Sequence, residues 1–236
     1  MSAPWNPHAR TENVALEEAT PRQIAAAIRA GRVPADHIFD RHLPENLRSA
    51  SSDFWTPLDV ALTVGSWLNE VGARTVLDVG AGVGKFCVAA SLLTDCVYFG
   101  IEHRPRLVEA ARELARRFEV EARVAFIEGE FGDAIIARAD AVYLYNPFGE
   151  NLRPYDDWLD DTVALGHARF RHDVALVERF LDSLPMGTHV VTYNGFGGRM
   201  SESFVEVRTD HTFANVLRMW RKDPVVDGLV RLSFRI

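Results

Sequence analysis

The sequence predicts an α/β fold built on a mostly parallel sheet of seven strands, and three observations support this prediction. Short apolar runs alternate with segments of helical periodicity, the pattern of strands joined by crossover helices. A glycine-rich loop separates the first apolar run from the helix that follows it. The connection at 223–228 is too short for a crossover helix, so the last two strands should be antiparallel. The predicted architecture is a Rossmann-like sheet that ends in a C-terminal antiparallel hairpin.

The individual elements follow from the same periodicities. We expect strands at 75–80, 97–102, 122–128, 141–146, 188–194, 214–222 and 229–236. We expect helices at 57–70, 84–94, 105–119 and 168–184.

The N-terminal part is predicted to be a helical cap. A short helix is expected at 21–30, a second helical segment at 36–48, and a polar hinge at 49–53. The apolar content of this part is too small for a core of its own. We therefore predict that residues 1–55 fold over the mouth of a ligand site and that residues 56–236 form the main domain.

Composition narrows the class of protein. The chain has 236 residues, a formal net charge of −7 and 47% hydrophobic residues, which is ordinary for a globular protein. It has no apolar run of the roughly 18–20 residues that span a bilayer, and residues 1–10 have no signal-peptide core. The two cysteines, Cys87 and Cys96, lie in apolar surroundings that favour reduced thiols. We predict a cytoplasmic protein without a membrane partner, and the acidic charge makes a nucleic-acid partner unfavourable.

The glycine-rich loop is the most informative segment. Residues 76–86 read Val-Leu-Asp-Val-Gly-Ala-Gly-Val-Gly-Lys-Phe. An apolar strand is followed by Gly80, Gly82 and Gly84, and helical periodicity begins at Lys85. Glycine permits a sharp turn and a close approach of ligand to backbone. The loop therefore predicts a site for a nucleotide-like ligand at the carboxyl edge of the sheet.

Two ligand classes fit this loop poorly. In a phosphate-binding P-loop, Val79 would stand in place of the first glycine and Phe86 in place of the metal-binding hydroxyl. In a dinucleotide loop, Lys85 would stand in place of the third glycine. Asp78, inside the strand, would repel a pyrophosphate but suits a cationic or zwitterionic ligand.

The run Asp78-x-Gly80-x-Gly82-x-Gly84 resembles motif I of the class I S-adenosylmethionine-dependent methyltransferases. This resemblance implies that residues 56–236 are a class I methyltransferase domain and that S-adenosylmethionine is the cofactor. Asp78 and the three glycines are then predicted to bind it.

The same resemblance extends to the next two strands. The second strand ends at Glu102, where the family has an acid that binds both ribose hydroxyls, although NAD enzymes use an acid there too. After the third strand, Glu130 matches the acid near the adenine amine, and Phe131 is placed against the adenine face. Glu128 and Asp133 are alternative acids for this role.

The fourth strand runs into Asn146-Pro147-Phe148, which resembles motif IV of the amino-methyltransferases, except that one proline replaces two. The resemblance implies that Asn146 and the Pro147 carbonyl accept hydrogen bonds from a substrate nitrogen. Phe148 would then pack against the substrate. The alternative interpretation is a turn that ends a strand.

Upstream of motif I, Phe54-Trp55-Thr56-Pro57 resembles the cofactor-covering motif of the amino-methyltransferases. Trp55 and Thr56 are therefore predicted to bind cofactor. The alternative is a helix start beside a buried aromatic residue.

Two loops are expected at the same edge of the sheet. The connection 149–167 is rich in acids and aromatic residues, which would suit a cationic amine or a lysine side chain, or form a solvated surface. The glycine-rich loop 193–199 would form the opposite wall or a tight connection. The histidines show no metal spacing, so no metal site is predicted.

Together these patterns predict an S-adenosylmethionine-dependent methyltransferase that acts on a nitrogen of a protein side chain or a small amine. An O- or C-methyltransferase of small molecules, a non-catalytic S-adenosylmethionine-binding protein and a nicotinamide oxidoreductase are the alternatives. The sequence gives no indication of the oligomeric state.

Overall fold

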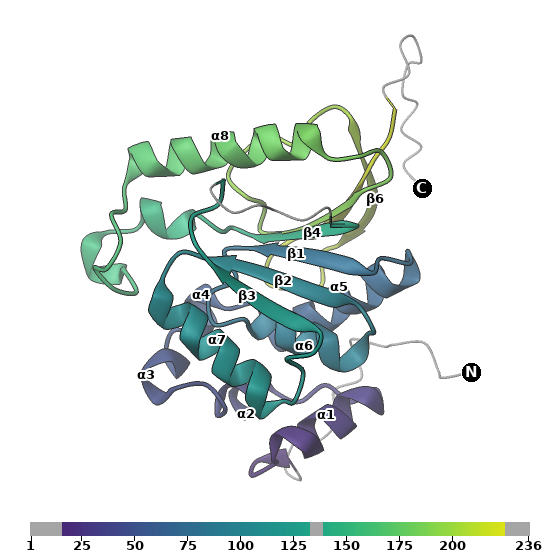
Figure 1. Ribbon diagram of the computed structural model, residues 1–236, viewed down its shortest axis with the longest axis vertical. Coiled ribbons are helices and arrows are strands. Elements are labelled where there is room, and N and C mark those ends of the chain that lie inside the picture. Colours follow the sequence, from purple (N-terminus) through teal and green to yellow (C-terminus); the bar gives the residue numbers. More distant parts are fainter. Residues whose placement is uncertain (1–15, 133–138, 225–236) are drawn as a thin grey trace.

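The computed structural model describes residues 16–132 and 139–224 of the chain. Its centre is a seven-stranded sheet in the order β3-β2-β1-β4-β5-β7-β6 (Figure 1). The strands are β1 (Thr75–Val79), β2 (Val97–Glu102), β3 (Val124–Glu128), β4 (Ala141–Tyr145), β5 (His189–Tyr193), β6 (Phe204–Asp210) and β7 (Leu217–Lys222). Strands β1 to β5 are parallel, whereas β7 is antiparallel to both β5 and β6. The predicted sheet class is confirmed.

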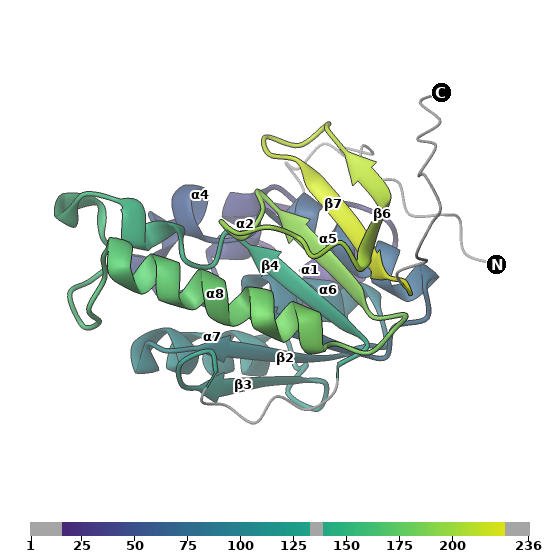
Figure 2. The same ribbon diagram turned by 90° about the horizontal axis from the view of Figure 1, so that it is seen from above.

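Helices cover both faces of the sheet (Figures 1 and 2). On one face lie α5 (Leu58–Glu70), α6 (Lys85–Leu93), α7 (Pro105–Arg117) and the N-terminal helices α1 (Pro21–Arg29), α2 (Asp36–Asp40), α3 (Glu45–Arg48) and α4 (Ser51–Phe54). On the other face lies α8 (His167–Ser183), and the short 3₁₀ helices η2 (Gly149–Leu152) and η3 (Tyr155–Asp157) precede it. None of the helices in the described ranges is long and apolar enough to cross a membrane.

The core has two apolar layers, because successive strand residues point to opposite faces. In β4, Tyr143 belongs to the layer beneath α5, α6 and α7, whereas Val142 and Leu144 belong to the layer beneath α8. Both faces of β4 are buried, which explains its uninterrupted apolar sequence.

The predicted strand at 214–222 is confirmed as β7, but its predicted pairing with 229–236 is wrong. Strand β7 pairs instead with β6 at Phe204–Asp210, a strand that the sequence pattern missed. The strand β6 lies at the edge of the sheet and most of its side chains are at least partly exposed, so it lacks an apolar signature. Residues 229–236 lie outside the described ranges.

The N-terminal segment packs on the main domain. Phe39 stacks on Phe118 at the end of α7, with ring centroids 4.6 Å apart, and Ile24 and Leu47 belong to the same apolar layer. The hinge predicted at 49–53 is wrong, because residues 51–54 form α4, where the Phe54 amide donates to the Ala50 carbonyl. The boundary at residue 55 stays a prediction.

Candidate functional site

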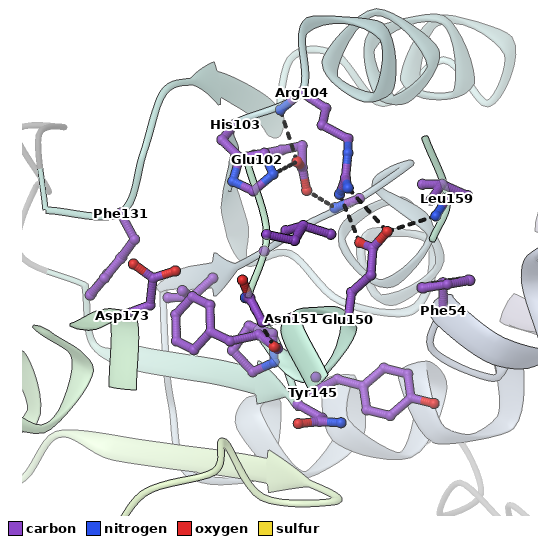
Figure 3. A pocket seen from close by; sticks show the side chains of 18 of the residues that line it. Phe54, Glu102, His103, Arg104, Phe131, Tyr145, Glu150, Asn151, Leu159 and Asp173 are labelled. Carbon is purple, nitrogen blue, oxygen red and sulfur yellow. Dashed lines mark hydrogen bonds and ion pairs between the residues drawn. The ribbon is translucent and has the colours of Figure 1, made fainter. Parts of the chain in front are cut away.

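The site lies at the carboxyl edge of the sheet, where the ends of β1, β2, β4 and β5 come together. A cavity of about 320 Å³ opens over this edge (Figure 3). Its walls are the glycine loop after β1, the end of β2, the turn after β4, the segment 52–55 and the start of α8. This is the position at which ligands bind in open α/β sheets, where the strand order reverses between β1 and β4.

Glycine is required at two points of the loop after β1. Gly80 and Gly82 have φ angles of 75° and 54°, in the left-handed region that favours glycine. A Cβ atom at Gly80 would lie 2.9 Å from Cβ of Pro147, and one at Gly82 would lie 2.7 Å from Cζ3 of Trp55. The loop is therefore packed directly between the β4 turn and the N-terminal segment.

Glu102 is held firmly at the end of β2. It is 7% exposed; its Oε2 accepts a hydrogen bond of 3.0 Å from the Gly82 amide, and its Oε1 accepts one of 2.9 Å from the Arg104 amide. An ionised carboxylate has about four acceptor positions, so two remain after these bonds. Its position in the cavity fits the vicinal hydroxyls of a ribose.

Arg104 anchors the connection between β4 and α8. Its guanidinium is 5% exposed and donates from Nε to Asp160 and from Nη2 to Glu150, each over 3.0 Å. Glu150 also accepts from the Leu159 amide at 2.7 Å (Figure 3). The segment that contains η2 and η3 is thus tied to Arg104, two residues after Glu102.

The turn after β4 brings Asn146, Pro147 and Phe148 to the cavity. Asn146 has a φ of 38°, which costs energy for a residue other than glycine and is common at functional sites. The backbone amide of Asn146 donates a hydrogen bond of 2.9 Å to the backbone carbonyl of Gly195. The backbone carbonyl of Asn146 accepts one of 3.0 Å from the backbone amide of Gly149. The loop 193–199 therefore supports this turn. Phe148 is 8% exposed and belongs to the apolar layer beneath α8.

Asp78 and Thr56 line a second, smaller hollow, which shares Phe54, Trp55, Gly80 and Tyr145 with the main cavity. Asp78 is 4% exposed, and burial raises its pKa to about 7, with the Cys87 thiol opposing and the charge of Glu102 adding to the rise. The Thr56 hydroxyl lies 3.1 Å from the Tyr143 hydroxyl, and both side chains are buried.

Trp55 covers the glycine loop. The ring is 6% exposed, packs against Gly82, and donates from Nε1 to the Leu47 carbonyl at 3.1 Å. The N-terminal segment thus supplies one wall of the cavity.

The remaining predicted residues are placed as follows. Phe131 lines the cavity, whereas Glu130 does not and forms an ion pair with Arg169 at 3.0 Å. Gly84 faces Phe126 and Ala111, so in the structure it serves helix packing.

Of the acids expected in the 149–167 connection, Asp160 is neutralised by Arg104, and Asp156 and Asp157 do not line the cavity. The cavity walls also include Arg104, Asn151, Arg153 and Asp173, which no sequence motif indicated. Only the position of Arg104, two residues after Glu102, could have drawn attention to any of them.

The described residues contain no group of three or more His, Cys, Asp or Glu side chains placed to hold a metal ion.

Comparison with known proteins identifies the domain. Residues 71–163 match the family described as methyltransferase domain. A 70-residue stretch, 29% of this chain, is 34% identical to sterol 24-C-methyltransferase of Debaryomyces hansenii, and it covers 19% of that enzyme. The chain therefore spans about a fifth of the curated relative that it matches.

Solved structures share the fold. An RNA methyltransferase of Salinibacter ruber, in complex with S-adenosylhomocysteine, aligns with a TM-score of 0.52 and 22% identity over 75% of this chain and 98% of its own. Magnesium protoporphyrin IX methyltransferase of Synechocystis, with bound cofactor, aligns with a TM-score of 0.50 and 11% identity over 76% and 83%.

The cavity fits the cofactor of these proteins. The buried carboxylate of Glu102 suits the ribose hydroxyls, the glycine loop allows close contact with the ligand, and the acid of Asp78 suits a cation. Residues 71–163 therefore match a methyltransferase domain, and the described fold is the one found in solved methyltransferases that bind this cofactor or its product.

Proposed function

We propose that this protein transfers the methyl group of S-adenosylmethionine to a nitrogen of a small amine or a protein side chain. The observation that carries the proposal is the contact between the β4 turn and the glycine loop. A Cβ at Gly80 would lie 2.9 Å from Cβ of Pro147 and 3.5 Å from the Pro147 carbonyl oxygen. The groups that would orient an acceptor therefore lie directly beside the cofactor loop.

The chain's own residues act by positioning. The amide oxygen of Asn146 and the carbonyl of Pro147 accept hydrogen bonds from the acceptor nitrogen, which directs its lone pair toward the cofactor. When bound, S-adenosylmethionine supplies an electrophilic methyl group and a neutral leaving group. The acceptor nitrogen releases one proton to solvent. Orientation and proximity then supply most of the acceleration.

We assign the cofactor contacts to residues around the loop. Glu102 binds the ribose hydroxyls, and Phe131 packs against the adenine. Trp55 and Thr56 close the site on the side of the N-terminal segment, and Asp78 faces the cationic end of the cofactor. Glu130, outside the cavity wall, would have to exchange Arg169 for the adenine amine.

A small molecule or a protein is the proposed acceptor, because the formal net charge of −7 opposes a phosphate backbone. An oxygen or carbon acceptor is the alternative that the same site would accommodate. A non-catalytic S-adenosylmethionine-binding protein is the second alternative.

The test combines binding and turnover. Calorimetry with S-adenosylhomocysteine measures cofactor binding, and S-adenosylhomocysteine release over a panel of amines, alcohols and activated carbon acids measures transfer. We expect Asn146→Ala to lower kcat at least tenfold with little change in S-adenosylhomocysteine affinity. The matched control is Asn69→Ala, an exposed asparagine in α5. Unchanged turnover in Asn146→Ala would contradict the role assigned to Asn146. If the wild-type protein binds S-adenosylhomocysteine but turns over no acceptor of the panel, the non-catalytic alternative is supported.

A further inference from the structure

The cavity wall carries positive charges, although the sequence of the 149–167 connection is rich in acids. Three arginines line the cavity: Arg104, Arg153 and Arg169. Arg104 is neutralised by Glu150 and Asp160, and Arg169 by Glu130 and Asp173. Each of these two cations is paired with two carboxylates, so its positive charge is neutralised within the wall.

Arg153 has no such partner. Within residues 16–132 and 139–224, no carboxylate lies within ion-pair distance of its guanidinium. Its Nη2 donates one hydrogen bond, 3.4 Å long, to the backbone carbonyl of Asp53. Its central carbon lies 4.5 Å from the centroid of the Phe54 ring. This is a cation–π contact, and among the described residues the guanidinium uses one of its five N–H donors in a hydrogen bond.

Arg153 shares a wall of the cavity with the groups that would orient the acceptor. It follows η2, and η2 follows the Asn146–Phe148 turn. Burial, the neighbouring Tyr193 and, least, the charge of Asp53 raise the pKa of the Tyr145 phenol, and the charge of Arg153 opposes that rise. The guanidinium is therefore within electrostatic reach of Tyr145, the residue before Asn146. Phe54 and Tyr145 lie on the same side of the cavity (Figure 3).

A positive charge at this wall disfavours a second cation and favours an oxyanion. A guanidinium presents parallel donors that match a carboxylate or a phosphate. Asp53 also lines the cavity, but its side chain is exposed to solvent and forms no ion pair with Arg153. Its charge is screened more strongly than that of the partly buried arginine.

We infer that the methyl acceptor is a small molecule that carries a carboxylate or phosphate group, and that Arg153 binds this group. This inference rests on the proposed function, and it narrows the acceptor to amines that bear an acidic group. Arg153 is then a specificity-determining residue, whereas Asn146 orients the reacting atom.

The binding test does not require the natural substrate. In the complex with S-adenosylhomocysteine, the Nε–H resonances of ¹⁵N-labelled arginines are followed while inorganic phosphate or acetate is added. We expect a saturable shift of the Arg153 signal, which is identified by its loss in Arg153→Gln. Arg171, an exposed arginine of α8 outside the cavity, is the internal control. The stronger of the two anions indicates which acidic group the acceptor carries.

A linear shift, or equal shifts at Arg153 and Arg171, would mean nonspecific ion binding and would overturn the inference.

A kinetic comparison distinguishes failure of this inference from failure of the proposed function. We expect β-alanine to be a better acceptor than propylamine, and Arg153→Gln to raise KM for the acidic amine at least tenfold. Neither kcat nor S-adenosylhomocysteine affinity should change more than about twofold.

Equal use of both amines by the wild type would contradict the inference and leave the nitrogen-transfer proposal intact. Saturable anion binding at Arg153 with no turnover of any amine would contradict the nitrogen-transfer proposal and retain the subsite.

Discussion

Two buried cations near the cofactor site hold different segments in place. Lys85 is the first residue of α6, directly after the glycine loop, and Arg104 occupies the N-cap position of α7, two residues after Glu102. The Lys85 cluster consists of Lys85, Asp36, Asp40 and Ser51 and ties the N-terminal segment to the sheet edge. The Arg104 cluster consists of Arg104, Glu150 and Asp160 and ties the connection before α8 to the same edge.

The two clusters differ in the direction in which they shift the pKa of their aspartate. The Lys85 side chain is 1% exposed; its ammonium lies 2.8 Å from Asp40 and 3.1 Å from the Ser51 hydroxyl, and it also contacts Asp36. Burial raises the pKa of Asp40, even though Lys85 opposes the rise. Burial would also raise the pKa of Asp160, but hydrogen bonds from Thr162 and the charge of Arg104 outweigh it and lower that pKa.

A buried ion pair can lower the stability of the fold as well as raise it, depending on how well the attraction offsets the desolvation of the charges. A lysine ammonium is a compact charge, and in the Lys85 cluster it does not fully compensate the desolvation of Asp40. Arginine offers a planar set of donors, and in the Arg104 cluster two carboxylates share them. We therefore regard the Lys85 cluster as a device that positions Trp55 and the N-terminal segment, at a cost in stability.

The largest effect is expected from Lys85→Met, which leaves Asp40 buried without its cation. Breaking a buried pair by removing one partner typically costs about 3–5 kcal/mol. We expect a loss of unfolding free energy of that order in urea denaturation. We also expect weaker S-adenosylhomocysteine binding, because the segment that carries Trp55 loses its tie to α6.

The double variant Lys85→Met with Asp40→Asn is the control for Lys85→Met. It removes both buried charges and should recover a large part of the lost stability. If the cluster positions Trp55, the double variant should still bind S-adenosylhomocysteine more weakly than the wild type. Full recovery of binding would show that the cluster has no positioning role.

A smaller loss is expected from Arg104→Met. The side chains of Glu150 and Asp160 are 11% and 9% exposed and lie in a surface connection, so they can turn toward water when their partner is removed. We expect a loss of about 1–3 kcal/mol, in the range for unsatisfied polar groups. Limited proteolysis should cut the connection 150–162 sooner than in the wild type.

Arg171→Met, on the exposed face of α8, is the control for Arg104→Met and should leave both stability and cleavage unchanged. If Arg104→Met destabilises the protein as much as Lys85→Met, the contrast between the two clusters is refuted.

The smallest effect, and the most direct test of the contrast, is the pH dependence of two aspartate variants. The raised pKa of Asp40 means that the folded state binds its proton more tightly than the unfolded state does. Its contribution to stability is therefore lost as pH rises above the ordinary aspartate range, and Asp40→Asn should gain on the wild type in that direction.

Asp160 has the opposite sign. Its lowered pKa stabilises the fold above the ordinary aspartate pKa, and this stabilisation is lost as pH falls through the folded-state value. Asp160→Asn should therefore fall behind the wild type as pH rises from about 2 to 4. Urea denaturation from pH 2 to 8 measures both trends, and parallel curves for the two variants would contradict the assigned directions.

The sequence by itself determined which segments of the chain form the parallel strands and the helices between them, because apolar periodicity follows directly from burial on one face or two. It also located the glycine loop, Glu102 and the Asn146 turn, since each comes at a strand end and the carboxyl ends of parallel strands share one edge. It missed β6, because an exposed edge strand has no apolar pattern.

Only the tertiary structure decided the ionic partners and the charge of the cavity wall. Lys85 and Asp36 are 49 residues apart in the chain, and Arg104 and Asp160 are 56 apart. No local sequence pattern links such pairs. An aspartate or glutamate on the surface and one in a buried ion pair are the same residue in the sequence. For the same reason, the sequence could not show that Arg104 and Arg169 are neutralised while Arg153 is left to face the cavity.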